Sequence, residues 1–169
     1  MGLIHIYCGD GKGKTTSATG LAVRSAGAGM KVFFARLMKG NYSSELRILE
    51  YIPEITVRSC DRNYGFSFNM TEKDKSEITQ CHNNMLREAF SSGYDVIVLD
   101  EFFSAYNCRL LDVSLALSLI KNKNPDTELI LTGRNPAPEF LELADYISEI
   151  ACIRHPYSSG IKARMGIEY

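Results

Sequence analysis

The chain of 169 residues is 45% hydrophobic and carries a formal net charge of −1 at pH 7, a composition that fits one globular domain with a sizeable core. It has neither the basic excess of a nucleic-acid-binding surface nor an apolar run long enough for a signal sequence or a membrane span. Five scattered cysteines without a Cys-x-x-Cys pair argue against a disulfide framework and a zinc ribbon. We therefore expect a single cytoplasmic domain over residues 1–169, with no nucleic acid and no membrane as partner.

Strand and helix patterns alternate along the chain. Short apolar runs rich in β-branched and aromatic residues predict strands within residues 3–8, 31–38, 55–60, 94–102, 127–132 and 146–155. Amphipathic or Ala- and Leu-rich segments predict helices within residues 14–28, 43–52, 71–93, 112–123 and 138–145. The alternation predicts an α/β fold in which helices cover both faces of a mostly parallel sheet.

The longest predicted helix begins with a capping-box pattern, Thr71 followed three residues later by Asp74. Its apolar stripe contains Ile78, Cys81, Met85, Leu86, Ala89 and Phe90. We interpret His82 as solvent-exposed helix surface, and His5 in the first strand as a packing residue.

The stretch CGDGKGKTTS, Cys8 to Ser17, joins the first predicted strand to the first predicted helix. Successive backbone N–H groups and a helix N-terminus make such a turn an anion site, to which Lys14 adds a full positive charge. The Thr15 hydroxyl is a typical Mg²⁺ ligand. The glycine spacing departs from that of the usual phosphate-binding loop, because Cys8 stands where the first Gly is expected. The alternative is a Gly- and Lys-rich turn that only connects two elements, but the strand and helix on either side favour nucleotide phosphates.

A second polar feature, VIVLDE, places Asp100 and Glu101 at the carboxyl end of a buried strand. Ligands of open parallel sheets bind outside these strand ends, so both carboxylates are expected to face the same crevice as Lys14 and Thr15. One carboxylate can hold Mg²⁺ directly and the other can act through water. The alternative is that Asp100 merely caps the following helix.

The combination of GDGKGKTT, VIVLDE, LTGR at residues 131–134, GFSF at residues 65–68 and the C-terminal SGIKARMGIEY resembles the ATP:cob(I)alamin adenosyltransferases of the corrinoid-biosynthesis type. The likeness runs in register from about Leu3 to Tyr169. It implies a single-domain P-loop NTPase-like, RecA-like fold. It also implies that the Co(I) ion of a corrinoid (cobalamin, cobinamide or cobyrinic acid a,c-diamide) attacks the 5′-carbon of ATP, so that triphosphate leaves intact, in cobalamin biosynthesis or salvage.

The resemblance assigns roles to matched residues. It implies catalytic roles for Lys14, Thr15 and Glu101, and Mg²⁺ binding by Thr15 and Glu101 with Asp100 as a further member. The expected ATP-binding residues are Gly9, Asp10, Gly11, Lys12, Gly13, Lys14, Thr15, Thr16 and Arg134. It further implies a homodimer and an electron donor such as flavodoxin or reduced flavin.

The resemblance also places the aromatic segment against the lower face of the corrin. There Phe66 and Phe68 would exclude the axial ligand from Co(II) and ease its reduction, whereas the residues alone would equally fit two core phenylalanines. Phe68 stands where better-known enterobacterial relatives carry Trp. This difference bears on which corrinoid is preferred more than on the reaction itself. The chain begins at its first strand, without their N-terminal helical extension, so we expect closure of the site to come from elsewhere.

Other functions remain open at this stage. A P-loop nucleotide kinase or ATPase of RecA-like type, such as a thymidine kinase, would also carry a phosphate-binding loop and acidic residues at a strand end. The shortened spacing of the loop in this chain, and the absence of paired Cys-x-x-Cys zinc ligands, count against this alternative. A non-catalytic nucleotide-sensing module would need only the same two motifs. His155, before Pro156, is not expected to be a ligand, and Arg134 could equally be a surface cation.

Overall fold

The computed structural model describes residues 1–38, 43–60, 62, 64–65, 69–91 and 93–168. Its centre is a six-stranded sheet in the order β3-β2-β4-β5-β1-β6, and every neighbouring pair is parallel. The strands are β1 (Ile4–Cys8), β2 (Val32–Arg36), β3 (Ile55–Ser59), β4 (Val96–Asp100), β5 (Glu128–Thr132) and β6 (Tyr146–Glu149). The predicted parallel α/β fold is confirmed.

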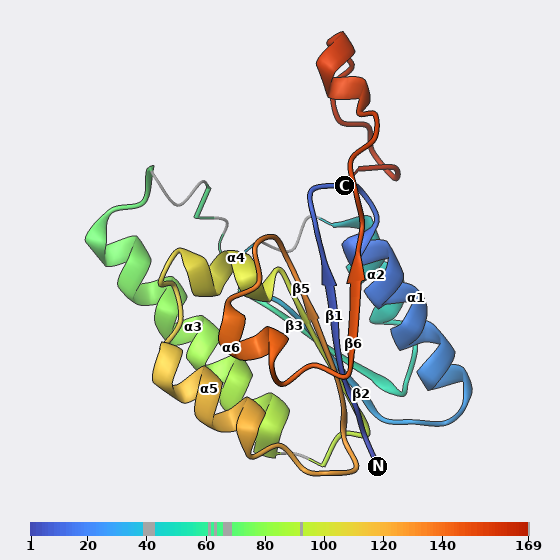
Figure 1. The fold of residues 1–169 in the computed structure, drawn as a ribbon, viewed down its shortest axis with the longest axis vertical. Coiled ribbons are helices and arrows are strands. Elements are labelled where there is room, and N and C mark those ends of the chain that lie inside the picture. The colour runs from blue at the N-terminus through green and yellow to red at the C-terminus, as the bar shows by residue number, and fades with distance from the viewer. Residues whose placement is uncertain (39–42, 61, 63, 66–68, 92, 169) are drawn as a thin grey trace.

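Helices cover both faces of this sheet (Figure 1). One face carries α1 (Lys14–Gly27) and α2 (Ser44–Leu49). The other carries α3 (Glu72–Ser91), α4 (Phe102–Asn107), α5 (Val113–Lys121) and α6 (Pro138–Leu141). A 3₁₀ helix, η2 (Pro156–Ser159), lies in the C-terminal segment.

The strands alternate their side chains between two apolar cores. In β2, Phe33 and Ala35 pack toward α3 and α4, whereas Val32 and Phe34 pack toward α1. Every residue of β2 and β4 is buried, as expected for central strands covered on both faces. The polar residues that end these strands therefore lie at the border between the apolar core and the site at the carboxyl end of the sheet.

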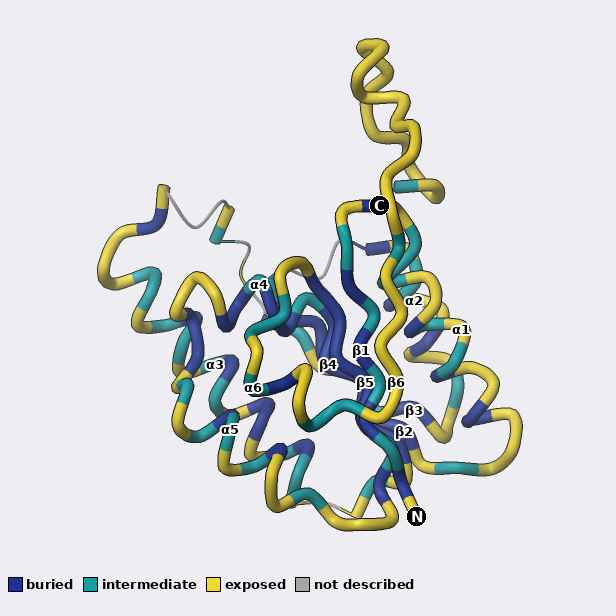
Figure 2. Tube along the Cα trace, viewed as in Figure 1, coloured by how far each residue is buried: buried dark blue, intermediate teal, exposed yellow. Residues whose placement is uncertain are grey.

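The C-terminal segment differs from this body. All four residues of β6 are exposed, and the chain from Ala151 to Ile167 is exposed throughout. Figure 2 shows this segment as a projection beyond the carboxyl end of the sheet. The last strand is shorter than the predicted range of 146–155, because its partner β1 ends at Cys8, which is paired with Glu149. Among the described helices, none is both long enough and apolar enough to cross a membrane.

Three sequence interpretations need correction. Helix α4 was not predicted, because its six residues directly follow a strand of the same apolar character. His82 is fully buried rather than exposed: its Nδ1 lies 2.6 Å from the Leu110 carbonyl oxygen and its Nε2 lies 3.2 Å from that of Leu37. Cys60 and Cys81 form a disulfide, although the cysteine spacing argued against one.

The capping box is confirmed. The Asp74 backbone N–H donates to Thr71 Oγ1 at 3.1 Å, and the Thr71 backbone N–H donates to Asp74 Oδ2 at 3.0 Å. This reciprocal pair satisfies two N–H groups at the start of α3. Helix α3 therefore begins where the sequence pattern places it.

Candidate nucleotide-binding site

The loop between β1 and α1 needs glycine for two separate reasons. Gly13, at φ 126°, adopts a backbone conformation that L side chains rarely take. Gly9 is also at positive φ, and a Cβ atom there would lie 2.5 Å from the Ile150 carbonyl oxygen. The loop packs tightly against the end of β6, where the Gly11 N–H donates to the same oxygen at 2.7 Å. The irregular spacing noted in the sequence is therefore compatible with a well-formed loop.

Lys14 folds back over this loop. Its Nζ donates to the carbonyl oxygens of Gly9 and Gly11 at 2.7 and 2.8 Å. Burial lowers the pKa of the Lys14 ammonium, and Arg134 lowers it further. A phosphate in the loop would replace backbone carbonyls with a charged partner for this ammonium.

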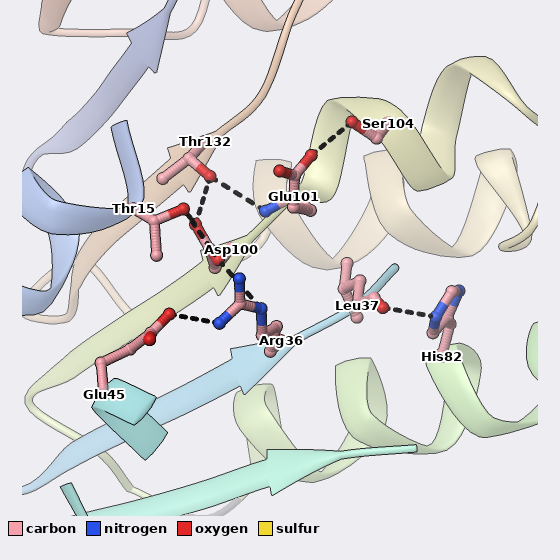
Figure 3. A network of polar contacts seen from close by, with 9 residues as sticks. All are labelled: Thr15, Arg36, Leu37, Glu45, His82, Asp100, Glu101, Ser104 and Thr132. Carbon is pink, nitrogen blue, oxygen red and sulfur yellow. Dashed lines mark hydrogen bonds and ion pairs between the residues drawn. The ribbon is translucent and has the colours of Figure 1, made fainter. Parts of the chain in front are cut away.

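Asp100 is the buried centre of a polar network at the end of β4 (Figure 3). The Thr15 hydroxyl donates to its carboxylate at 3.0 Å, and the Thr132 hydroxyl donates to it at 2.7 Å. Burial raises the pKa of Asp100, whereas Arg36, with Nε 3.7 Å from Asp100 Oδ2, opposes that shift. Asp100 therefore orients Thr15 from behind the wall of the site.

Glu101 adopts a left-handed backbone conformation, at φ 60°, which is unusual for a residue with a side chain. Its N–H donates to Thr132 Oγ1 at 2.9 Å, and its carboxylate accepts from Ser104 Oγ at 2.6 Å. Glu101, not Asp100, stands at the N-cap of α4, and its side chain makes no capping hydrogen bond. The alternative role of Asp100 as a mere helix cap is therefore wrong.

These elements enclose a cavity of about 480 Å³ at the carboxyl end of the sheet. Of the sequence-predicted site residues, the cavity is lined by Asp10, Gly11, Lys12, Gly13, Lys14, Thr15, Thr16, Glu101 and Arg134. Gly9 and Asp100 are not among the lining residues; Asp100 is hydrogen-bonded to Thr15, which lines the cavity. Arg134 sits at the rim, where its Nε is 3.4 Å from Asp10 Oδ1. Phe66 and Phe68 lie outside the described residues, so their role stays a prediction.

The cavity also has walls that the sequence analysis missed. They are Thr19, Arg36, Ser44, Glu45, His155, Gly166, Ile167 and Glu168. Arg36 is 3% exposed and forms an ion pair with Glu45 of α2. An arginine that interrupts an apolar strand at its carboxyl end was the available signal, because a buried guanidinium needs carboxylate partners. Glu168 comes from the far end of the chain, and Lys12 Nζ lies 3.2 Å from its Oε1, a contact that local patterns cannot predict.

The residues at this cavity fit a magnesium ion bound together with a nucleotide. The described part of the chain contains no cluster of three or more His, Cys, Asp or Glu side chains that could hold a metal alone. Thr15 and Glu101 instead offer one hydroxyl and one carboxylate at the cavity wall. Mg²⁺ is typically bound by one or two such groups together with phosphate oxygens and water.

Comparisons with known proteins identify the family of the chain. The family model described as "ATP:corrinoid adenosyltransferase BtuR/CobO/CobP" matches residues 1–169. The "Corrinoid adenosyltransferase" of Escherichia coli (strain K12) is 29% identical over 168 residues, which are 99% of this chain and 86% of that relative. "Corrinoid adenosyltransferase CobA" of Salmonella typhimurium is also 29% identical, with the same coverage. The "Corrinoid adenosyltransferase" of a Sinorhizobium species is 28% identical over 175 residues, or 99% of this chain and 80% of that relative.

Proposed function

The chain belongs to the ATP:corrinoid adenosyltransferase family, and from this premise we propose that it transfers the 5′-deoxyadenosyl group of ATP to the Co(I) ion of a corrinoid. In this reaction a cobalt–carbon bond forms with the electron pair of Co(I). The bond between C5′ and its phosphate oxygen breaks, and that electron pair leaves with triphosphate. Because the nucleophile is the metal of the substrate, no side chain has to remove a proton.

The observation that carries this proposal is the cavity itself. The Lys14 loop, Thr15 and Glu101 all line it, and the Thr15 hydroxyl donates to Asp100. Negative charge builds on the triphosphate as it departs, and donors that are already oriented stabilise that charge without rearrangement. Lys14, Lys12 and the N-terminus of α1 are these donors in the proposed complex.

Magnesium would be held by Thr15 and Glu101 in this proposal, with Asp100 orienting Thr15. Bound there, Mg²⁺ supplies positive charge to the leaving triphosphate. The proposal also includes assembly as a homodimer, a cytoplasmic location and an electron donor such as flavodoxin or reduced flavin. Phe66 and Phe68 are proposed to lie under the corrin and to favour reduction of Co(II).

One assay tests the reaction. The protein is incubated with MgATP and a chemically reduced corrinoid, and the corrinoid spectrum and phosphate products are followed. We expect a light-sensitive cobalt–carbon product and triphosphate in equal amounts. Release of ADP and phosphate would instead indicate a kinase or ATPase, and binding of ATP without turnover would indicate a nucleotide-sensing module.

The proposed role of the aromatic segment has its own test. Replacing Phe66 and Phe68 together by Ala is expected to slow turnover that starts from Co(II) much more than turnover from pre-reduced Co(I). Equal losses with both starting states would show that the two rings do not serve reduction.

A further inference from the structure

The turn that follows β5 carries Arg134 and has an unusual backbone conformation. Gly133 lies at φ 143° and Asn135 at φ 51°, so the residues on both sides of Arg134 are at positive φ. A residue with a side chain, such as Asn135, keeps that conformation only where surrounding contacts stabilise it. The position of the Arg134 side chain therefore depends on what holds this turn.

Helix α4 holds the turn at two points. A Cβ atom at Gly133 would lie 2.8 Å from the Cβ atom of Phe103, so the backbone of the turn packs directly against α4. Asn107, the last residue of the helix, donates from Nδ2 to the carbonyl oxygens of Arg134 and Asn135 at 3.2 and 3.0 Å. An amide NH₂ group has two N–H donors, so this one side chain satisfies both carbonyls.

The same helix begins beside the proposed magnesium site. Glu101 is the N-cap of α4, and Ser104 donates to the Glu101 carboxylate at 2.6 Å. A helix of six residues thus contacts Glu101 at its start and the backbone of Arg134 at its end. Both Glu101 and Arg134 line the cavity, so α4 sets the spacing between them.

Arg134 reaches the glycine loop from this turn. Its Nε lies 3.4 Å from Asp10 Oδ1, and its charge lowers the pKa of the Lys14 ammonium. The two cations therefore act on one region of the cavity, where the proposed triphosphate would bind. A guanidinium binds phosphate through a planar fork of N–H groups, so its contribution depends on how it is oriented.

We propose that Asn107 is a positioning residue for nucleotide binding: it fixes the backbone of the turn and thereby orients the Arg134 guanidinium toward the triphosphate. The inference rests on the proposed function, from which it takes its ligand. Asn107 is not among the residues that line the cavity. An effect of Asn107 on nucleotide affinity must therefore pass through another residue, and its hydrogen bonds lead to Arg134.

A double-mutant cycle of Asn107→Ala with Arg134→Ala tests this role. The measurements are dissociation constants for MgATP and for inorganic triphosphate with Mg²⁺, taken without corrinoid. We expect Asn107→Ala to weaken both about three- to tenfold, and to add nothing in the Arg134→Ala background. An equal loss in both backgrounds would overturn the proposal. Unchanged affinity in either single variant would overturn it too, because Asn107 would then have no effect or nothing to position.

Two further variants separate the hydrogen bonds from the size of the side chain. Asn107→Asp keeps the size but turns carboxylate oxygens toward the two carbonyls, whereas Asn107→Gln keeps the NH₂ group on a longer side chain. We expect the Asp variant to lose at least as much affinity as Asn107→Ala and the Gln variant to lose less. The reverse order would overturn the proposal.

Asn122→Ala is the matched control. Asn122 is an exposed residue at the C-cap of α5, and its Nδ2 donates to the Ser118 carbonyl oxygen at 2.8 Å. Neither residue lines the cavity, so we expect wild-type affinity, and a loss equal to that of Asn107→Ala would count against the proposal. Thermal unfolding checks that every variant is folded at the temperature of the measurement. The expected cycle in a protein that shows no adenosyl transfer would contradict only the proposed function.

Discussion

At the scale of single residues, the site depends on buried polar groups whose hydrogen bonds are made within the protein. Thr132 is 1% exposed; its hydroxyl donates to Asp100 and accepts from the Glu101 N–H. One side chain thus holds both members of the acidic pair in place. This role explains how Glu101 keeps a left-handed backbone, since surrounding contacts must stabilise such a conformation.

The substitution Thr132→Val tests this role. Valine leaves the Glu101 N–H without its acceptor and removes one hydrogen bond from Asp100, so we expect the free energy of unfolding to fall by about 1–3 kcal/mol. The measurement is urea unfolding, with Thr56→Val in the partly buried strand β3 as the control, for which a change of about 0.5 kcal/mol or less is expected. Equal changes in the two variants would show that the Thr132 hydrogen bonds contribute no special stability.

His82 predicts a pH dependence of stability. Burial lowers the pKa of its imidazole in the folded protein, although the Leu110 and Leu37 carbonyls favour the charged ring. The unfolded state therefore binds the proton first as the pH falls below about 6.5, and stability decreases from that pH downward. Above that pH the neutral ring retains its full contribution.

The check is urea unfolding of the wild type and His82→Gln between pH 8 and pH 5. We expect the wild type to lose stability over this range and the variant, although less stable at pH 8, to lose less. Replacing the exposed His155 by Gln is the control. An unchanged slope in His82→Gln would rule out His82 as the source of the effect.

At the scale of elements, sequence patterns predict what is local and miss what is long-range. The strands are found because short apolar runs with β-branched residues are typical of a buried parallel sheet, and the capping box places the start of α3. His82 lies four residues from both Ile78 and Leu86, so the period of α3 places it on the buried face. The interpretation as exposed followed the polarity of the residue, and the carbonyls of Leu37 and Leu110 that satisfy its ring come from distant parts of the chain.

The same distinction holds for the site. The loop, Asp100 and Glu101 could be predicted because each has a local pattern and parallel strands bring their carboxyl ends to one edge. Thr19, Arg36 and Glu45 could not be predicted as cavity residues, because they come together only where α1, β2 and α2 meet. Glu168 joins Lys12 across nearly the whole length of the chain.

The disulfide between β3 and α3 gives a prediction at this scale. Cys60 and Cys81 are 21 residues apart, with Cα atoms 6.2 Å apart. Closing such a loop restricts the unfolded chain and is expected to contribute about 3 kcal/mol. Urea unfolding with and without reductant should show this difference in the wild type and not in Cys60→Ser. A thiol titration that finds all five cysteines free in unreduced, denatured protein would contradict the pairing.

At the scale of the whole molecule, the compact body and the exposed C-terminal segment have different roles. The body supplies the loop and the acidic pair, whereas the segment contributes Gly166, Ile167 and Glu168 to the cavity wall. Arg164 and its backbone N–H hold the pKa of Glu168 at about 2, so this residue presents a negative charge to Lys12 at neutral pH. The Glu168 carboxylate is thus paired with Lys12, whose ammonium would bind triphosphate in the proposed complex.

Ending the chain after Gly160 separates these roles. Residues 161–167 are exposed, so the free energy of unfolding should change by about 0.5 kcal/mol or less. Affinity for MgATP should be retained or increased, because Lys12 loses a competing carboxylate. Turnover with Co(I) corrinoid should fall at least about tenfold, because the cavity loses a wall that keeps water from the reacting groups.

Glu168→Gln isolates the charge, and we expect it to reproduce the gain in affinity without the loss of turnover. Full turnover in the shortened chain would show that the segment is dispensable for the reaction.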